Sequence, residues 1–419
     1  MKLSEFKNAG HWPTLLSAFL YFDIGFMAWV AIGPLIVYIT KSMNFTVDEK
    51  FMLVSIPVLA GAILRIPLGI MADRIGPKLT GMIAQVAVML GALYAWQFGL
   101  DSKLEIEIFG IILGIGGASF AVALPQASRW YPPQYQGIVM GIAGAGNLGV
   151  VIDALLAPTL AENYGWQSVF GFLLIPMACI LAFYAIAAKD APVERKPVSL
   201  KKYGALLTDP DSRWFMFFYF ITFGGFVGLG NALPLYFTVQ YHVSGVAAGA
   251  MVALIVAFGS CFRPVGGYIA DRIGGIKALS ILFCVVAAAY LGVSILPEGP
   301  PAPVPAGWTL TALPGIAWIA VLLFSTGALA LGMGNGSVFQ LIPQRFRNEI
   351  GVMTGLVGCA GGIGGFFLAR TLGISKAATG GFGAGFLFFA ALALVGLLGL
   401  VIVKSRWRTT WGAVSGAKV

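Results

Sequence analysis

The sequence carries little charge for its length. Of its 419 residues only 10% are Asp, Glu, Lys or Arg, whereas 58% are hydrophobic. A soluble globular protein carries about 25% charged residues. This composition therefore excludes that class and indicates a protein with many membrane spans.

Groups suited to covalent or metal chemistry are also scarce. The two histidines, His11 and His242, fall at the ends of apolar runs, and no His/Asp or Cys/His constellation faces the membrane. We therefore expect no enzyme activity, no cofactor and no metal site. Cysteines at unrelated spacings inside apolar runs predict small core residues without a disulfide framework; they are Cys179, Cys261, Cys284 and Cys359.

What the sequence does contain is a series of twelve apolar runs, each long enough to cross a bilayer. They lie at roughly 14–39, 50–71, 79–99, 104–127, 136–160, 166–188, 213–239, 246–269, 278–297, 313–342, 350–370 and 380–403. They predict an all-α membrane protein with twelve transmembrane helices. Because the longest polar stretch separates six runs from six, the expected parts are an N-terminal half (1–188), a cytoplasmic linker (189–212), a C-terminal half (213–403) and a cytoplasmic tail (404–419).

The excess of positive charge has a topological explanation. With a cytoplasmic N-terminus, five Lys and Arg residues lie on the outer side, two lie within the membrane, and the other 19 of the 26 lie inside. By the positive-inside rule, both termini are then cytoplasmic. The net charge of +9 thus needs no nucleic-acid partner. The first apolar run is too long for a cleaved signal peptide.

One pattern of thirteen residues occurs twice. Residues 64–76 and 262–274 share seven positions, and Arg65 precedes Asp73 by eight residues, as Arg263 precedes Asp271. An arginine keeps its proton, and its charge at bilayer depth costs roughly 2.5–3.5 kcal/mol, so it normally faces a protein interior or a watery cavity. Two such cations, one in each half, predict a central site for a small anion. A buried structural ion pair is the alternative.

The ends of these two segments resemble a loop motif of the major facilitator superfamily. The motif residues are Gly69, Asp73, Arg74, Gly76 and Lys78 in the first half and Gly267, Asp271, Arg272 and Gly274 in the second. The resemblance implies two six-helix halves related by an axis along the membrane normal. It also implies that Asp73, Arg74, Asp271 and Arg272 form gates; plain hairpin capping and topology charges are the alternative.

The fifth run contains Gly144, Gly146 and Gly149 around Asn147, which match the pattern G-x-G-x-x-G. A dinucleotide site would need a strand before this pattern and a helix after it, and a membrane span excludes that. The motif instead resembles the signature of the nitrate/nitrite porter family within the superfamily. Gly358, Gly361 and Gly364 in the eleventh run resemble the second signature of that family. Glycines here are expected to allow close approach of backbones.

The family resemblance also implies a substrate site. Arg65 and Arg263 stand where the family has its substrate arginines, and Phe120, Tyr219 and Phe223 match aromatic positions that flank the anion. We expect Asn147 to donate an amide hydrogen bond. Ordinary helix packing is the alternative for the aromatic residues, and an interhelical hydrogen bond is the alternative for Asn147.

The function implied is alternating-access transport of nitrate, and of nitrite as a second substrate, by a monomer in a bacterial-type inner membrane. A porter of organic anions and an anion sensor that does not transport remain alternatives.

Coupling depends on the charge of the site. Two fixed cations hold +2 when empty and +1 with nitrate, which favours exchange of nitrate for nitrite. Asp23 in the first run offers another solution, because its ionisation in the empty site and protonation in the loaded site keep the charge at +1. This favours nitrate–proton symport, with a permanent Asp23 salt bridge as the alternative. The rival carboxylate, Asp153, is expected near the outer surface.

Overall fold

The computed structural model describes residues 9–132, 136–144, 147–192, 200–299, 315–346 and 349–415. All regular elements in these ranges are helices, and they form twelve segments long and apolar enough to cross a membrane. The prediction of an all-α protein with twelve membrane spans is confirmed.

The first six spans come from residues 12–187, and several of them are built from two consecutive helices. The elements are α2 (Trp12–Val30), α3 (Ile32–Ile39), α4 (Val47–Ile75), α5 (Pro77–Phe98), α6 (Lys103–Gly117), α7 (Phe120–Ser128), α8 (Gln136–Gly144), α9 (Leu148–Tyr164) and α10 (Trp166–Ala187).

The remaining six spans follow a short helix, α11 (Leu200–Thr208). The elements are α12 (Pro210–Tyr241), α13 (Gly245–Cys261), α14 (Arg263–Ile273), α15 (Gly275–Ser294), α16 (Gly315–Arg345), α17 (Ile350–Thr379), α18 (Gly383–Thr409) and the short α19 (Trp411–Ser415).

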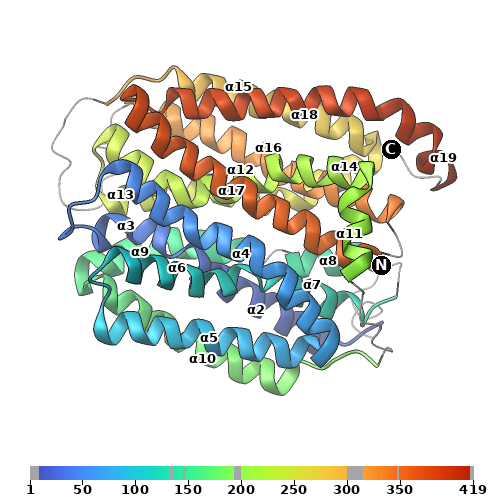
Figure 1. The fold of residues 1–419 in the computed structure, drawn as a ribbon, viewed down its shortest axis with the longest axis horizontal. Coiled ribbons are helices and arrows are strands. Elements are labelled where there is room, and N and C mark those ends of the chain that lie inside the picture. The colour runs from blue at the N-terminus through green and yellow to red at the C-terminus, as the bar shows by residue number, and fades with distance from the viewer. Residues whose placement is uncertain are drawn as a thin grey trace.

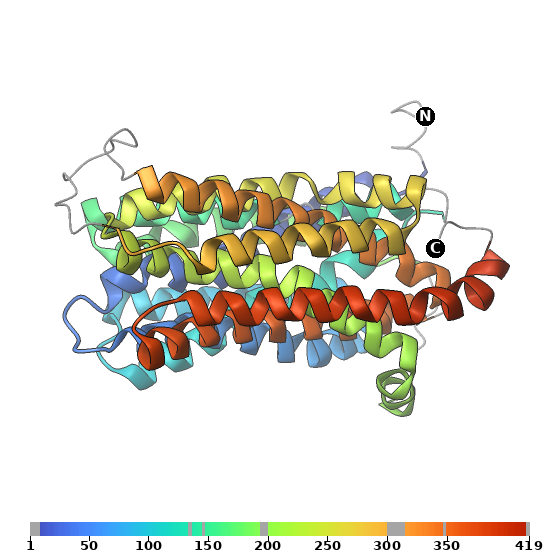
Figure 2. The same cartoon turned by 90° about the horizontal axis from the view of Figure 1, so that it is seen from above.

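The long helices run side by side along one direction (Figure 1). We call the end where α2 begins and α18 ends the terminal end, at the right of Figure 1, and the opposite end the distal end. Helix α11 lies at the terminal end, across the direction of the long helices (Figure 2). The two sets of six spans meet where α4 packs on α17, α3 on α12 and α9 on α13.

Small residues bring the helices of the two sets together. A Cβ atom added to Gly365 of α17 would lie 3.0 Å from Cγ1 of Val58 in α4, and one added to Gly362 would lie 2.5 Å from Cβ of Ala62. Glycine at these positions lets the backbones of α4 and α17 approach closely, as is common between membrane helices. This contact runs beside Arg65, which α4 also carries.

The two arginine segments, alike in sequence, differ in local structure. Arg65 lies inside the continuous helix α4, whereas α13 ends at Cys261 and Arg263 is the first residue of α14. Pro264 directly follows Arg263, and the residue before a proline is disfavoured in a helix. In the first segment the proline is Pro67, two residues after the arginine, and α4 continues through it.

Two helices extend beyond the apolar runs that predicted them. Helix α4 continues to Ile75, so Asp73 and Arg74 lie in its last turn and only Gly76 separates it from α5. Helix α18 continues to Thr409. The apolar runs end where charged residues begin. The helices continue through these charged residues, because the last turns of a membrane helix can extend out of the membrane.

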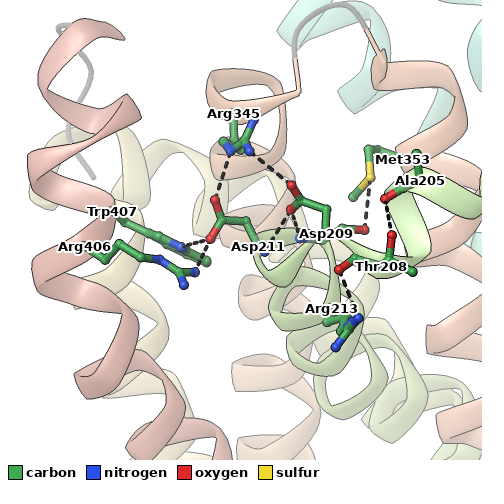
Figure 3. Close-up of polar contacts among 10 residues, drawn as sticks. Ala205, Thr208, Asp209, Asp211, Arg213, Arg345, Met353, Arg406 and Trp407 are labelled. Atoms are coloured by element: carbon green, nitrogen blue, oxygen red, sulfur yellow. Dashed lines mark hydrogen bonds and ion pairs between the residues drawn. The ribbon is translucent and has the colours of Figure 1, made fainter. Parts of the chain in front are cut away.

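A cluster of charges holds the terminal end of α18 against α12 (Figure 3). Asp211 accepts hydrogen bonds from Nε of Arg345 at 2.9 Å, from Arg406, and from Nε1 of Trp407 at 2.7 Å. Asp209 accepts from Arg345 at 3.2 Å and caps α12 through the backbone amides of Asp211 and Ser212. The cluster fixes the start of α12 to two other helices of the second set.

The prediction that the cysteines are core residues is wrong for three of them. Cys179, Cys261 and Cys284 are exposed on the bundle, and Cys359 is partly buried; all four are free thiols. A thiol side chain is apolar enough to face lipid, so its place in an apolar run does not distinguish the core from the lipid-facing surface.

Candidate functional site

Arg65 is buried at the centre of the bundle, with 1% of the residue exposed. Its Nε donates to the carbonyl of Gly117 at 3.3 Å, and its Nη1 donates to the carbonyl of Gly358 in α17. The Gly117 carbonyl is free to accept because α6 ends there, and the last carbonyls of a helix lack intrahelical partners. The Nη2 group of Arg65 has no hydrogen-bond partner among the described residues.

Arg263 approaches the same region from the second set of helices. Its Nη2 donates to the hydroxyl of Tyr219 at 3.2 Å, whereas its Nη1 is buried and has no partner among the described residues. The charges of Arg65 and Arg263 are close enough to interact. Each guanidinium group therefore keeps one buried donor nitrogen that the described part of the protein does not satisfy.

Aromatic rings surround both guanidinium groups. The Cζ atom of Arg65 lies 5.2 Å from the ring centre of Phe120, 5.1 Å from that of Phe223 and 5.5 Å from that of Trp29. Tyr219 stacks on Phe223 with ring centres 5.0 Å apart, and its hydroxyl reaches Arg263. The structure thus brings Arg65, Arg263, Phe120, Tyr219 and Phe223 into one cluster.

Phe339 belongs to this cluster, and the sequence analysis did not single it out. The Cζ atom of Arg263 lies 5.6 Å from its ring centre, and the ring lies 5.2 Å from that of Tyr219 and 6.2 Å from that of Phe120. The signal available was its place in the tenth apolar run, 313–342. A phenylalanine in an apolar helix gives no further indication of the face it occupies.

No carboxylate neutralises the two arginines in the part of the chain that the structure describes. None of the ion pairs there includes Arg65 or Arg263. The cluster therefore carries two uncompensated positive charges inside apolar surroundings. A small anion is the natural complement of such a site, because an isolated charge at this depth is costly.

The glycines of the second signature line this cluster. A Cβ atom added to Gly358 would lie 3.1 Å from Nη1 of Arg65, and one added to Gly361 would lie 2.7 Å from the ring of Tyr219 and 2.8 Å from that of Phe223. Gly364, one turn further, faces the backbone of α12 at Phe220. The space beside α17 is therefore filled by the arginine and the aromatic rings.

The first signature lies in the broken fifth span. Gly144 ends α8 with open space where a side chain would begin, and Gly149 in the first turn of α9 packs against the backbone of α2 at Asp23. Gly146 lies outside the described residues. Asn147 stands at the N-cap position of α9 without a side-chain capping hydrogen bond; it is 2% exposed, and its side-chain oxygen has no partner among the described residues. No hydrogen bond joins Asn147 to Arg65 or Arg263 in that part of the chain.

A cavity of about 180 Å³ leads from Arg65 toward the terminal end. Its walls come from α4, α7, α11 and α17, and it includes Asp73, Arg129, Lys202 and Glu349 near its mouth. Liquid water occupies about 30 Å³ per molecule, so the cavity has room for a small hydrated anion. Burial and the neighbouring Asp73 raise the pKa of Tyr203, which also lines the mouth.

The four expected gate residues have different surroundings. Asp73 accepts a hydrogen bond from Arg129 at 2.7 Å, which joins the end of α4 to the residue after α7. Arg74 and Asp271 are exposed. Arg272 stacks on Tyr268, with its Cζ atom 4.5 Å from the ring centre. In the second half the arginine at the end of the tenth span, Arg345, pairs with Asp209 and Asp211 instead.

Of the two candidate carboxylates, Asp23 of α2 contacts α9 and Asp153 is part of α9. The backbone amide of Gly149 donates to Oδ1 of Asp23 at 2.7 Å, and Asp23 forms no ion pair among the described residues. Asp153 is 2% exposed and lies eleven residues before the end of α9, or about 16 Å along the axis. The prediction that it lies near the outer surface is wrong, because the fifth span continues beyond the apolar run to Tyr164.

Comparisons with known proteins agree with this architecture. The sequence model of the Major Facilitator Superfamily matches residues 17–369. The chain is 32% identical over 387 residues to a nitrite extrusion protein of Bacillus subtilis, covering 92% of each chain. It is 34% identical over 385 residues to the probable nitrate transporter NarT of Staphylococcus carnosus, covering 90% of this chain and 91% of the relative.

Proposed function

The chain belongs to the nitrate/nitrite porter family of the Major Facilitator Superfamily, and from this premise we propose that it carries nitrate or nitrite across a membrane by alternating access. The observation that supports this best is the pair of guanidinium groups, one from each half, each of which keeps one buried donor nitrogen without a partner among the described residues. The protein is then a carrier and not an enzyme.

The chemistry of the site fits a compact planar oxyanion. Nitrate is flat and singly charged, with three equivalent acceptor oxygens, and planar guanidinium forks match such a target better than an ammonium group does. The edges of aromatic rings carry partial positive charge, so Phe120, Tyr219, Phe223 and Phe339 tolerate a flat anion between them. We expect a site narrowed by these rings to exclude bulky carboxylates, which disfavours an organic-anion porter.

We assign the terminal end of the bundle to the cytoplasm of a bacterial-type inner membrane, on the asymmetry of Lys and Arg between the loops. The cavity at Arg65 then opens to the cytoplasm, and the structure corresponds to an inward-facing state. Asp73, Arg74, Asp271 and Arg272 act at this end as gate residues. The two halves, 1–188 and 213–403, move against each other around the central site, joined by the linker 189–212.

For coupling we favour nitrate–proton symport through Asp23. A carboxylate without an ion-pair partner is free to exchange its proton, whereas a permanent salt bridge would hold it ionised. Asp23 is half-buried and hydrogen-bonded only to the amide of Gly149 among the described residues. Protonation together with nitrate binding keeps the charge of the moving site at +1.

Reconstitution of the purified protein in liposomes tests both parts of this proposal. Vesicles without any internal anion receive external nitrate with and without an imposed pH gradient, acidic outside. We expect nitrate accumulation that needs the gradient. Uptake only into vesicles preloaded with nitrite would exclude symport and indicate antiport, whereas nitrate binding in detergent without flux in either condition would indicate a sensor.

A further inference from the structure

Asp153 is a buried acid to which the proposed function gives no role. It lies in the second turn of α9, it is 2% exposed, and its Oδ2 has no hydrogen-bond partner among the described residues. Nor does it take part in an ion pair within the described ranges. Buried polar atoms are normally hydrogen-bonded, so an orphaned carboxyl oxygen calls for a functional explanation.

The helices packed against α9 offer Asp153 no cation. Helices α2, α3, α10 and α13 contain no Lys, Arg or His, and α12 contains only Arg213, in its first turn at the terminal end. Their other ionisable side chains, together with those of α9, are Tyr21, Asp23, Tyr38, Glu162, Tyr164, Cys179, Tyr184, Asp211, Tyr219, Tyr236, Tyr241 and Cys261. An ionised Asp153 would therefore be an isolated charge within the bundle, which is unfavourable; the protonated acid avoids this cost.

Asp153 also lies where the two halves meet. Val150, Asp153, Ala154 and Ala157 share one buried face of α9. A Cβ atom added to Gly230 of α12 would lie 3.3 Å from Val150, and one added to Gly249 of α13 would contact the carbonyl of Ala154. We call this contact of α9 with α12 and α13 the distal seam; Figure 1 shows α9 and α13 together toward the distal end.

Alternating access requires the distal seam to open once in each cycle. Separation of α9 from α13 would bring the face with Asp153 into contact with water, where a carboxyl group has its ordinary pKa of about 3.9 and is ionised at neutral pH. Closure must then either trap an isolated anion or be accompanied by uptake of a proton.

We propose that Asp153 is a proton-binding site that controls the distal seam: the halves close over it only when its carboxylate has taken up a proton from the distal solution. The proton adds to a carboxylate oxygen on closure and returns to the same solution on reopening. Closure is therefore favoured as the distal pH falls. This inference rests on the proposed alternating access but not on proton symport, because the proton at Asp153 does not cross the membrane.

The test is a distance measurement across the distal seam. Spin labels replace Asn163, after the seam on α9, and His242, before α13, in a full-length chain without its native cysteines; both positions are exposed. For the wild-type seam we expect the ratio of open to closed molecules to rise at least about tenfold between pH 5 and pH 8, which corresponds to the release of one proton on opening over at least about one pH unit of this range. Asp153→Asn, a neutral isostere, should stay closed across this range.

Glu162→Gln is the matched control, because it removes an exposed carboxylate of the same helix and should leave the pH response of the seam intact. A wild-type ratio that does not change with pH would overturn the inference, as would an Asp153→Asn curve that follows the wild type. Should Asp153→Asn not fold, Asp153→Glu replaces it, and an unshifted midpoint would then count against the site. The spin-label distances do not depend on nitrate flux. Failure of nitrate transport in liposomes would therefore count against the proposed function and not against the role of Asp153.

Discussion

At the scale of single residues, the site depends on the fork geometry of two guanidinium groups. Arg65 uses Nε and Nη1 to bind the carbonyls of Gly117 and Gly358, and Arg263 uses Nη2 to bind Tyr219. These bonds orient each side chain and leave one buried nitrogen free on each. A lysine ammonium in either position would be a point charge on a flexible stem, unable to hold its neighbours and the anion together.

We therefore expect Arg65→Lys and Arg263→Lys to lower kcat/KM for nitrate at least about 100-fold, since two charge-assisted hydrogen bonds of about 1.5–3 kcal/mol each are lost. Nitrate uptake into liposomes measures the effect at equal protein content. Arg408→Lys, at an exposed position of α18, is the matched control and should transport like the wild type. Wild-type uptake by either site variant would refute the assignment of these arginines.

At the scale of the helix, the glycines of α17 matter because they leave room for groups from neighbouring helices. Gly358 and Gly361 make room for Arg65 and for the stacked rings of Tyr219 and Phe223, and Gly362 and Gly365 let α17 pack on α4. The same helix carries Gly355, beside the cavity, where a Cβ atom would meet nothing within 4 Å. Neighbouring glycines of one helix thus differ in what a methyl group would displace.

This difference gives a matched pair of variants. Gly361→Ala should push Tyr219 and Phe223 away from their positions, at a cost typical of overpacking, about 1–3 kcal/mol, and should slow nitrate transport at least about tenfold. Gly355→Ala should leave transport unchanged and raise the thermal midpoint slightly, because alanine favours a helix over glycine by about 1 kcal/mol. Thermal unfolding in detergent and liposome uptake measure the two effects. Equal behaviour of the two variants would contradict the packing explanation.

At the scale of the whole molecule, the two ends of the bundle differ in how the halves are joined. Toward the terminal end, the cavity lies between residues of α4 and α7 and residues of α17. At the distal end Asp48 of α4 forms an ion pair with Arg370 of α17, which joins the first half to the second. A second pair there, between Glu49 and Lys103 at 3.2 Å, lies within the first half.

The ion pair between the halves should favour the distally closed state. Arg370→Ala is expected to raise the ratio of open to closed molecules about two- to fivefold, the range that corresponds to a partly exposed pair worth about 0.4–1 kcal/mol. The exchanged pair Asp48→Arg with Arg370→Asp should restore the wild-type ratio, and Lys103→Ala should not change it. Spin-label distances across the distal end provide the measurement; an equal effect of Lys103→Ala would show that charge at this end, and not the contact between halves, is responsible.

Much of this protein follows from its sequence. The apolar runs give the twelve spans, because every span must satisfy its backbone within itself in lipid. The repeated arginine segments identify Arg65 and Arg263 as exceptional, because a permanent charge in such a run needs a reason. The family signatures then indicate the substrate class. These inferences use the length of the apolar runs, the repeat of a short motif and the position of charges, which are local properties of the chain.

The tertiary structure alone decided which faces of the helices meet. It brought Phe339 to the cluster, turned three cysteines outward, and placed the acid Asp153 inside the seam between the halves rather than near the surface. It also separated the two arginine segments into a continuous helix and a broken one. In a chain where nearly every span is apolar on all sides, hydrophobicity does not distinguish core from lipid, so packing between helices determines the orientation of each side chain.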